Sequence, residues 1–338
     1  MKKLIACILM TLFISSISTA AEKPFNLNFA LSDPATHYEV KGVYGVWAKE
    51  VEKRTGGRVK VRLYPGQTLG KQNEQFDLVL RGAAQLTIMV GTQYPGRFPL
   101  TDVFNLPFLI PPDGPGSPGK EIRDMVYAKY LIPLYFKDVK VLWNGRYQPN
   151  VIHMAKDPVR KLEDIKGKVI GFPGGRLFPA YIKTIGASPI QAPSPDVYTM
   201  LEKGVIDGMI FPFETQLAFK LSDVAKFVTM TNQGSASKCL IMRKETWESF
   251  SPDIQKTIED LNPWTEELMF KVNQGAFQKI SQLSKKVGVE MIELSPAERE
   301  RWTQAAKSVE LEWVAEMDAK GLPGTALYND IKKMIGEN

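Results

Sequence analysis

The sequence predicts an α/β protein with two lobes, and two observations carry this prediction. The alternating stretch 25–31 is followed by helical spacing over 38–55 and by a strictly alternating stretch at 58–64. This strand–helix–strand order implies parallel pairing of the two strands. A second unit of the same kind opens at 168–172, in a chain long enough to form two hydrophobic cores.

The remaining elements of the first lobe follow from the same patterns. A turn from Ser32 to His37 separates the first strand from its helix, and Gly56-Gly57 ends that helix. A helix, a strand and two strands that leave the lobe are then expected, at 72–81, 85–90, 140–143 and 150–154. The loop 111–119 is rich in proline and glycine, which predicts a mobile surface segment.

The second unit is predicted to continue with two helices and a strand, at 177–185, 196–202 and 205–211, and a further strand is expected at 237–242. A long helix begins at Ser251 and runs to about Lys286, with a kink expected at Pro263. Ser295-Pro-Ala-Glu298 is a capping box, which predicts the start of a further helix that ends near Gly321.

The chain begins with the order of a secretion signal. Lys2-Lys3 is a basic start, and the mostly apolar run 4–17 is too short to span a membrane. Small residues follow, so cleavage is expected after Ala20 or Ala21. We therefore predict a signal peptide over 1–20, a periplasmic mature protein, and no membrane span in that mature chain.

The two cysteines add little chemistry. Cys7 resembles a lipoprotein processing site, but the apolar run follows it instead of preceding it, which argues against lipidation. Without Cys7 the mature chain has only Cys239, so no intrachain disulfide can form. Cys239 lies in an apolar stretch, which predicts a buried and unreactive thiol.

Composition and motifs exclude several functions. The formal charge is +6, but the basic residues are scattered and form no stripe with aromatic residues, so nucleic-acid binding is not expected. The sequence has no phosphate-binding loop, dinucleotide fingerprint, nucleophile elbow or zinc-protease motif. Its two histidines, His37 and His153, have no carboxylate at ligand spacing. We therefore expect no metal, no cofactor and no enzymatic activity.

Several stretches, in their order and spacing, resemble one family over nearly the whole mature chain. That family is the DctP-type extracytoplasmic solute receptors of tripartite ATP-independent periplasmic (TRAP) transporters. The stretches that carry the resemblance are Tyr64-Pro-Gly-Gln-Thr-Leu-Gly70, Gly91 to Pro99, Phe104-Asn-Leu-Pro-Phe108, Leu162-Glu-Asp-Ile-Lys-Gly167, Gly186-Ala-Ser-Pro189 and Val205-Ile-Asp-Gly208.

The resemblance implies a two-lobed periplasmic binding protein fold, type II-like, with a ligand cleft between the lobes and a long kinked helix spanning both. Lobe I would comprise 21–147 and 237–276, and lobe II 148–236 and 277–338. The lobes would close over a small-molecule solute. A monomeric receptor would then deliver it to the small and large TRAP membrane subunits.

The chain departs from the family at the expected anchor for a carboxylate. The arginine that usually follows the Lys-Gly step falls on Gly171, a second arginine falls near Val151, and an asparagine falls on Phe211. Arg176, after a Gly-Gly turn, is our first candidate for a replacement, because a guanidinium donates two parallel hydrogen bonds to a carboxylate. Its alternative is a surface arginine near a helix start. Arg146, on a crossing strand, is the second candidate.

The other candidate ligand contacts come from the expected cleft segments, and each has a structural alternative. They are His37, Trp143, His153, Phe211, Phe213 and Glu214. The histidines and aromatic residues could instead belong to the core, and Glu214 could be solvated or could pair with an arginine across the cleft. Together they favour a small organic acid with an apolar body, such as an aromatic or branched monocarboxylate. A neutral or zwitterionic solute, or a role as a periplasmic sensor partner, remains the alternative.

Overall fold

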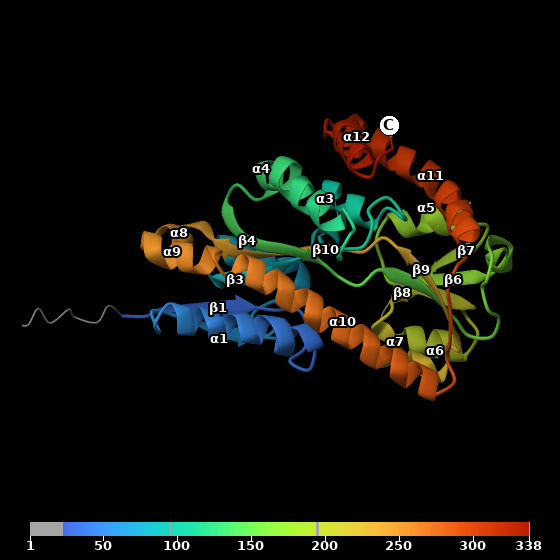
Figure 1. Cartoon of the computed structure of the whole chain (residues 1–338), viewed down its shortest axis with the longest axis horizontal. Helices are drawn as coiled ribbons and strands as arrows, with labels where there is room; N and C mark the ends of the chain where they lie inside the picture. Colours follow the sequence, from blue (N-terminus) through green and yellow to red (C-terminus); the bar gives the residue numbers. More distant parts are fainter. Residues whose placement is uncertain (1–22, 95, 194–195, 338) are drawn as a thin grey trace, which may run out of the picture.

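The structure is a computed structural model that describes residues 23–94, 96–193 and 196–337. Two separate β-sheets lie at the two ends of an elongated molecule, each covered by helices (Figure 1). This architecture confirms the α/β fold class. The predicted signal peptide and the residues around its cleavage site lie outside the described residues.

The first sheet has five strands in the order β2-β1-β3-β10-β4. Their bounds are β1 Phe25–Ala30, β2 Val59–Tyr64, β3 Leu86–Met89, β4 Val139–Arg146 and β10 Ser237–Arg243. Strand β1 pairs in parallel with both β2 and β3, as the strand–helix–strand pattern predicted. Strand β10 enters from far along the sequence and runs antiparallel between β3 and β4.

The second sheet has six strands in the order β11-β9-β5-β8-β6-β7. Their bounds are β5 Asn150–Met154, β6 Val169–Phe172, β7 Ser188–Gln191, β8 Gly208–Pro212, β9 Phe227–Gln233 and β11 Glu290–Ile292. The sequence pattern did not predict β7, β9 or β11. Two of these, β7 and β11, are short edge strands, and such strands carry little hydrophobic alternation.

Two antiparallel chain segments cross from one sheet to the other side by side. Residues 147–149 join β4 to β5, and residues 234–236 join β9 to β10. The Tyr147 amide donates to the Ala236 carbonyl at 3.1 Å, and the Asn150 amide donates to the Gly234 carbonyl at 3.0 Å. The crossings therefore form one narrow hydrogen-bonded ribbon, in which few residues need to change conformation for the sheets to move.

The third connection is helix α10, Asn262–Lys286, which runs along both halves of the molecule (Figure 1). The pattern predicted one kinked helix from Ser251. The structure instead has a separate helix α9, Pro252–Glu259, and places Pro263 in the first turn of α10. Proline is tolerated there because a first-turn amide has no partner within the helix. The boundaries of the two lobes along the chain stay a prediction.

Helices cover both sheets. They are a π-helical turn Val40–Tyr44 continued by α1 Gly45–Arg54, then α2 Gln75–Leu80, α3 Gly119–Val126, α4 Ile132–Tyr135, α5 Leu177–Thr184, α6 Val197–Glu202, α7 Thr215–Ala218, α8 Lys244–Glu248, α11 Pro296–Ala319 and α12 Gly324–Met334. None of the helices within 23–94, 96–193 and 196–337 combines the length and the apolar character that a bilayer crossing requires.

Cys239 lies on β10 and is fully buried and unpaired, as predicted. Burial raises the pKa of its thiol to about 12, which keeps the reactive thiolate scarce at neutral pH. This cysteine therefore acts as a small core residue.

The Ser295 cap at the start of α11 gives a stability test; the Glu298 carboxylate does not complete the predicted capping box, because it accepts from the Leu162 amide. The Ser295 hydroxyl accepts from the Glu298 amide at 3.2 Å, whereas Ser251, at the start of α9, makes no such bond. We expect Ser295→Ala to lower the free energy of unfolding by about 1 kcal/mol in urea titrations. The matched Ser251→Ala should lower it by less. An equal loss for both variants would show that the Ser295 bond contributes nothing.

Candidate ligand-binding cleft

A cavity of about 350 Å³ opens where strands of the two sheets end. Its walls come from the ends of β3, β6 and β8, at Val90, Pro173 and Phe211, and from the crossing segment at Tyr147. Ligands of open α/β sheets bind at the carboxyl ends of parallel strands, because loops from several strands converge there. This cavity is therefore the candidate ligand cleft.

The walls combine apolar surface with neutral polar groups. The apolar side is formed by Val90, Leu177, Phe178 and Phe211, and the polar side chains that line the cleft without a formal charge are Gln72, Thr92, Gln93, Asn105, Tyr147, Gln148 and Asn150. Such a cavity suits a small molecule with an apolar body and several hydrogen-bonding groups. Within the described part of the chain, its lining contains one cation, Arg176, and one carboxylate, Asp102.

Arg176 is presented by a glycine turn that follows β6. Gly174 and Gly175 adopt φ values of +155° and +92°, which residues with a side chain rarely adopt, and α5 begins at the next residue after Arg176. The Arg176 Nε donates to Asp102 Oδ2 at 2.6 Å, and its Nη1 pairs with Glu316 of α11. Asp102 lies in the 3₁₀ segment Pro99–Asn105, so this ion pair crosses the cleft.

The Asp102 carboxylate is well buried at this contact. Burial raises the pKa of its carboxyl group, and Arg176 partly opposes that rise. Asp102 thus occupies, from within the protein, part of the guanidinium edge that a ligand carboxylate would use. An anionic ligand at Arg176 has to displace Asp102 or share the guanidinium with it.

Gly171, where the family arginine was expected, does not face the cleft. A Cβ at this position would lie 2.8 Å from Ile206 Cδ1 and 3.1 Å from Ala192 Cβ, within a buried apolar cluster. A long cationic side chain here would collide with that cluster. A cation that binds a ligand carboxylate in this cleft must therefore come from another position of the chain.

Arg146 lies outside the cleft, on the opposite side of the crossing ribbon. Its Nε donates to Ser235 Oγ at 2.9 Å and its Nη1 to the Pro111 carbonyl at 2.7 Å, and it contributes to the wall of a second cavity. Burial lowers its pKa to about 10, so it remains charged at neutral pH. Arg146 joins the crossing segments to the loop 111–118 and is not part of the proposed cleft.

Three further candidates pack in the interior. Trp143 is 3% exposed and stacks near Tyr44, and Phe213 packs on Phe277 of α10. His153 is fully buried between the Phe211 carbonyl and the Gln216 amide, and burial lowers its pKa to about 4. None of the three lines the cleft. Each instead belongs to the buried interior, which was the alternative stated for the histidines and aromatic residues.

The last two candidates, His37 and Glu214, lie close to a buried polar cluster between the sheets. Its centre is the ion pair of Lys238 with Glu39, both fully buried. The Lys238 Nζ also lies 4.2 Å from the ring centroid of Tyr147, which links this cluster to the cleft wall. Of the predicted contacts, the structure therefore places Arg176 and Phe211 in the cleft, and His37 and Glu214 near the polar cluster.

Glu214 gives the cluster a pH dependence. Burial and the nearby Glu39 raise the pKa of Glu214 from 4.5 to about 7, and Lys238 opposes this rise. The folded state binds this proton more tightly than the unfolded state does. The contribution of Glu214 to the unfolding free energy is therefore fully present below about pH 4.5 and is lost as the pH rises to about 7. Relative to Glu214→Gln, the parent should lose about 3 kcal/mol of unfolding free energy over that range.

The measurement is urea unfolding of both proteins at several pH values. His153 acts in the opposite direction, because its stability contribution is lost as the pH falls from 6.5 toward 4. It is common to both proteins, so their difference isolates Glu214. A difference that stays constant with pH would contradict the raised pKa of Glu214.

Sequence reasoning missed most of the cleft wall. Tyr147 and Gln148 follow directly after β4 and Asn150 begins β5, so the predicted crossing strands could have pointed to them. Asp102 lies in a 3₁₀ segment with no strand-end signal, and its contact with Arg176 joins residues far apart in the sequence. Only the tertiary structure brings that pair together.

Comparison with known proteins agrees with this geometry. Residues 29–316 match the family described as bacterial extracellular solute-binding protein, family 7, DctP. The chain belongs to this family. Its members are receptors of TRAP transporters and not enzymes, which confirms the predicted family and class of protein.

Two of three similar proteins are named for the acids that they bind. The 2,3-diketo-L-gulonate-binding periplasmic protein YiaO of Escherichia coli is 25% identical over 85% of this chain and 84% of its own. A TRAP solute-binding protein from Desulfovibrio salexigens is 28% identical with a TM-score of 0.82, over 92% of this chain and 95% of its own. A marine metagenome TRAP protein specific for aromatic acid ligands, solved with metahydroxyphenylacetate, is 26% identical with a TM-score of 0.80, over 92% and 98%.

Proposed function

We propose that this protein is the periplasmic receptor of a TRAP transporter for a small aromatic monocarboxylate. The ligand lies in the 350 Å³ cleft, with its carboxylate at Arg176 and its ring between Phe178 and Phe211. The receptor acts as a monomer that closes around the ligand and delivers it to the small and large membrane subunits. Export through a cleaved signal peptide belongs to the same proposal.

The observation that carries the proposal is a single guanidinium in a largely apolar and neutral wall, where Asp102 is the one carboxylate of the described lining. Arg176 lines the cleft together with the aromatic side chains of Phe178, Phe211 and Tyr147. A planar guanidinium selects a carboxylate, and aromatic walls select a flat apolar body. The aromatic-acid receptor from the marine metagenome supports this class of ligand.

The alternative is a neutral or zwitterionic solute. It rests on the Asp102 carboxylate, which already pairs with Arg176 and reduces the positive potential of the cleft. In that case the neutral polar side chains would provide most of the recognition. A role as a sensor partner uses the same cleft, and solute uptake by vesicles that contain the membrane subunits would distinguish transport from sensing.

The test compares an acid with its amide. Calorimetry and thermal unfolding with phenylacetate and phenylacetamide should show binding of the acid and at least about tenfold weaker binding of the amide. A ligand present at a hundred times its dissociation constant stabilises the protein by about 2.7 kcal/mol, which thermal unfolding detects. Equal binding of the two compounds would support the neutral-ligand alternative instead.

A further inference from the structure

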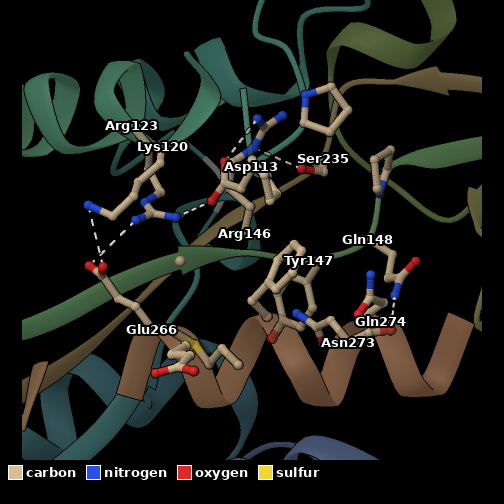
Figure 2. Close-up of a pocket in the computed structure, with 18 of the residues that line it drawn as sticks. Asp113, Lys120, Arg123, Arg146, Tyr147, Gln148, Ser235, Glu266, Asn273 and Gln274 are labelled. Atoms are coloured by element: carbon tan, nitrogen blue, oxygen red, sulfur yellow. Dashed lines mark hydrogen bonds and ion pairs between the residues drawn. The ribbon is translucent and has the colours of Figure 1, made fainter. Parts of the chain in front are cut away.

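A second and larger cavity, of about 610 Å³, lies on the other side of the crossing ribbon. Its walls are the loop 112–115, helix α3, one face of α10, and the end of β4 with the crossing segment that follows it, 145–149, together with Ser235 (Figure 2). The loop predicted to be mobile is tied to this wall, because Pro111 accepts from Arg146 and Asp113 pairs with Arg123. A volume of this size holds a small organic molecule.

The cations that line this cavity already have protein partners. Arg146 donates to Ser235 and to the Pro111 carbonyl, and Arg123 donates to Asn144, Asp113 and Asp124. Lys120 pairs with Asp124 and with Glu266 of α10, as Figure 2 shows for the Glu266 contact. An anion entering the cavity would have to break these contacts, so the cavity does not favour one.

The cavity offers acceptors instead. Asn273 Oδ1 on α10 and Asp113 Oδ1 on the loop are buried and accept no hydrogen bond from the described residues, although Arg146 Nη1 lies 3.6 Å from Asp113 Oδ1. Four carboxylates line the cavity against three cations, since Glu121, Glu266 and Glu267 add to Asp113. An unsatisfied buried acceptor is costly, so a group that donates hydrogen bonds and carries positive charge would be stabilised here.

The rest of the wall is apolar. Met269, Phe270 and Phe277 of α10 line the cavity. Tyr147 of the crossing segment lies over this helix (Figure 2). Gly145 leaves room for the Met269 side chain, since a Cβ at position 145 would lie 3.3 Å from Met269 Sδ. These surfaces suit a short apolar body attached to the donating group.

We propose that this hinge cavity is a second ligand site, which binds a small amphipathic amine with its ammonium group at Asp113 and Asn273 and its apolar body against α10. The site is separate from the cleft and has the opposite charge preference. Its existence does not depend on which solute the cleft binds.

The two cavities share a wall, so the amine should influence the cleft. Tyr147 and Gln148 line both cavities, and both belong to the segment that joins the two sheets. An occupant of the hinge cavity therefore contacts the residues through which the sheets would move. Linkage requires that each ligand change the affinity of the other by the same factor, which we expect to be about threefold or more.

Calorimetry with 2-phenylethylamine and 2-phenylethanol, without any acid, tests the site. The amine should bind at least about tenfold more tightly than the alcohol, because only the ammonium carries charge to Asp113. Asn273→Phe, which fills the cavity, should abolish amine binding. The matched Gln278→Phe, on an exposed position of the same helix outside the cavity wall, should leave it intact. Melting temperatures of both variants verify that they fold.

Three results would overturn the site: no heat from the amine at millimolar concentration, equal binding of amine and alcohol, or unchanged amine binding to Asn273→Phe. The coupling is tested by titrating phenylacetate with and without saturating amine, and an unchanged dissociation constant would overturn it. Failure of phenylacetate to bind at all would count against the proposed cleft function, while the amine titrations would still decide the second site.

Discussion

Lys238→Met should cost about 3–5 kcal/mol of unfolding free energy, the largest loss that we expect from a single substitution. Lys238 and Glu39 are both fully buried and form an ion pair, and Glu39 also accepts from the Tyr44 hydroxyl at 2.9 Å. Removal of the ammonium leaves the Glu39 carboxylate buried without its counter-charge. Such a group must either be desolvated as an ion or take up a proton, and both are unfavourable at neutral pH.

Urea unfolding of two further variants separates this effect from simple loss of packing. Adding Glu39→Gln to Lys238→Met removes the isolated charge and keeps an acceptor for Tyr44, so it should restore most of the lost stability. Lys256→Met removes an exposed partner of Asp260 and should cost less than about 0.5 kcal/mol. If the double variant is no more stable than Lys238→Met, then lost packing and not the unpaired carboxylate explains the result.

The ion pair stands beside Tyr147, whose ring contacts the Lys238 ammonium and whose side chain lines both cavities. The same pair therefore fixes the residue that the cleft and the hinge cavity share.

The fold could be predicted from local patterns where those patterns are strong. The strands at 25–31 and 58–64 alternate strictly, and their parallel pairing in register from Phe25 and Val59 follows from the helix between them. The kink predicted at Pro263 was wrong, because α9 ends at Glu259 and Pro263 lies in the first turn of the new helix α10. A proline is compatible with a kink and with a helix start, so its presence alone does not decide between them.

The site could be predicted only in part, because sequence position does not determine which way a side chain points. Gly171 and Arg176 lie five residues apart, yet a side chain at Gly171 would enter an apolar cluster while Arg176 lines the cleft. Arg146 ends a crossing strand as expected, but it faces the opposite side of the ribbon from the cleft. Strand alternation places neighbours on opposite faces, and only the structure shows which face borders the cleft.

Arg176→Ala should weaken binding of an aromatic acid by at least about tenfold, equivalent to roughly 1.4 kcal/mol. Truncating one partner of a buried charge pair commonly costs about 2–5 kcal/mol, but the Arg176 side chain is 33% exposed, so we expect a loss at or below the lower end of that range. Arg160→Ala is the matched control, because Arg160 also forms an ion pair, with Glu290 at 2.7 Å, but does not line the cleft. Calorimetry with phenylacetate should show normal binding for the control.

Asp102→Asn should have the opposite effect on the same ligand. Asp102 competes with the acid for Arg176, so removing its charge frees the Nε edge of the guanidinium, while Glu316 still pairs with Nη1, and lowers the negative potential of the cleft. We expect binding of phenylacetate to become about three- to tenfold tighter, with little change for phenylacetamide. Parent affinity should also rise as the pH falls, because protonation of Asp102 has the same consequence as the substitution, and the asparagine variant should lose this dependence. If Asp102→Asn weakens acid binding as much as Arg176→Ala does, then the cross-cleft ion pair positions Arg176 and does not compete with the ligand.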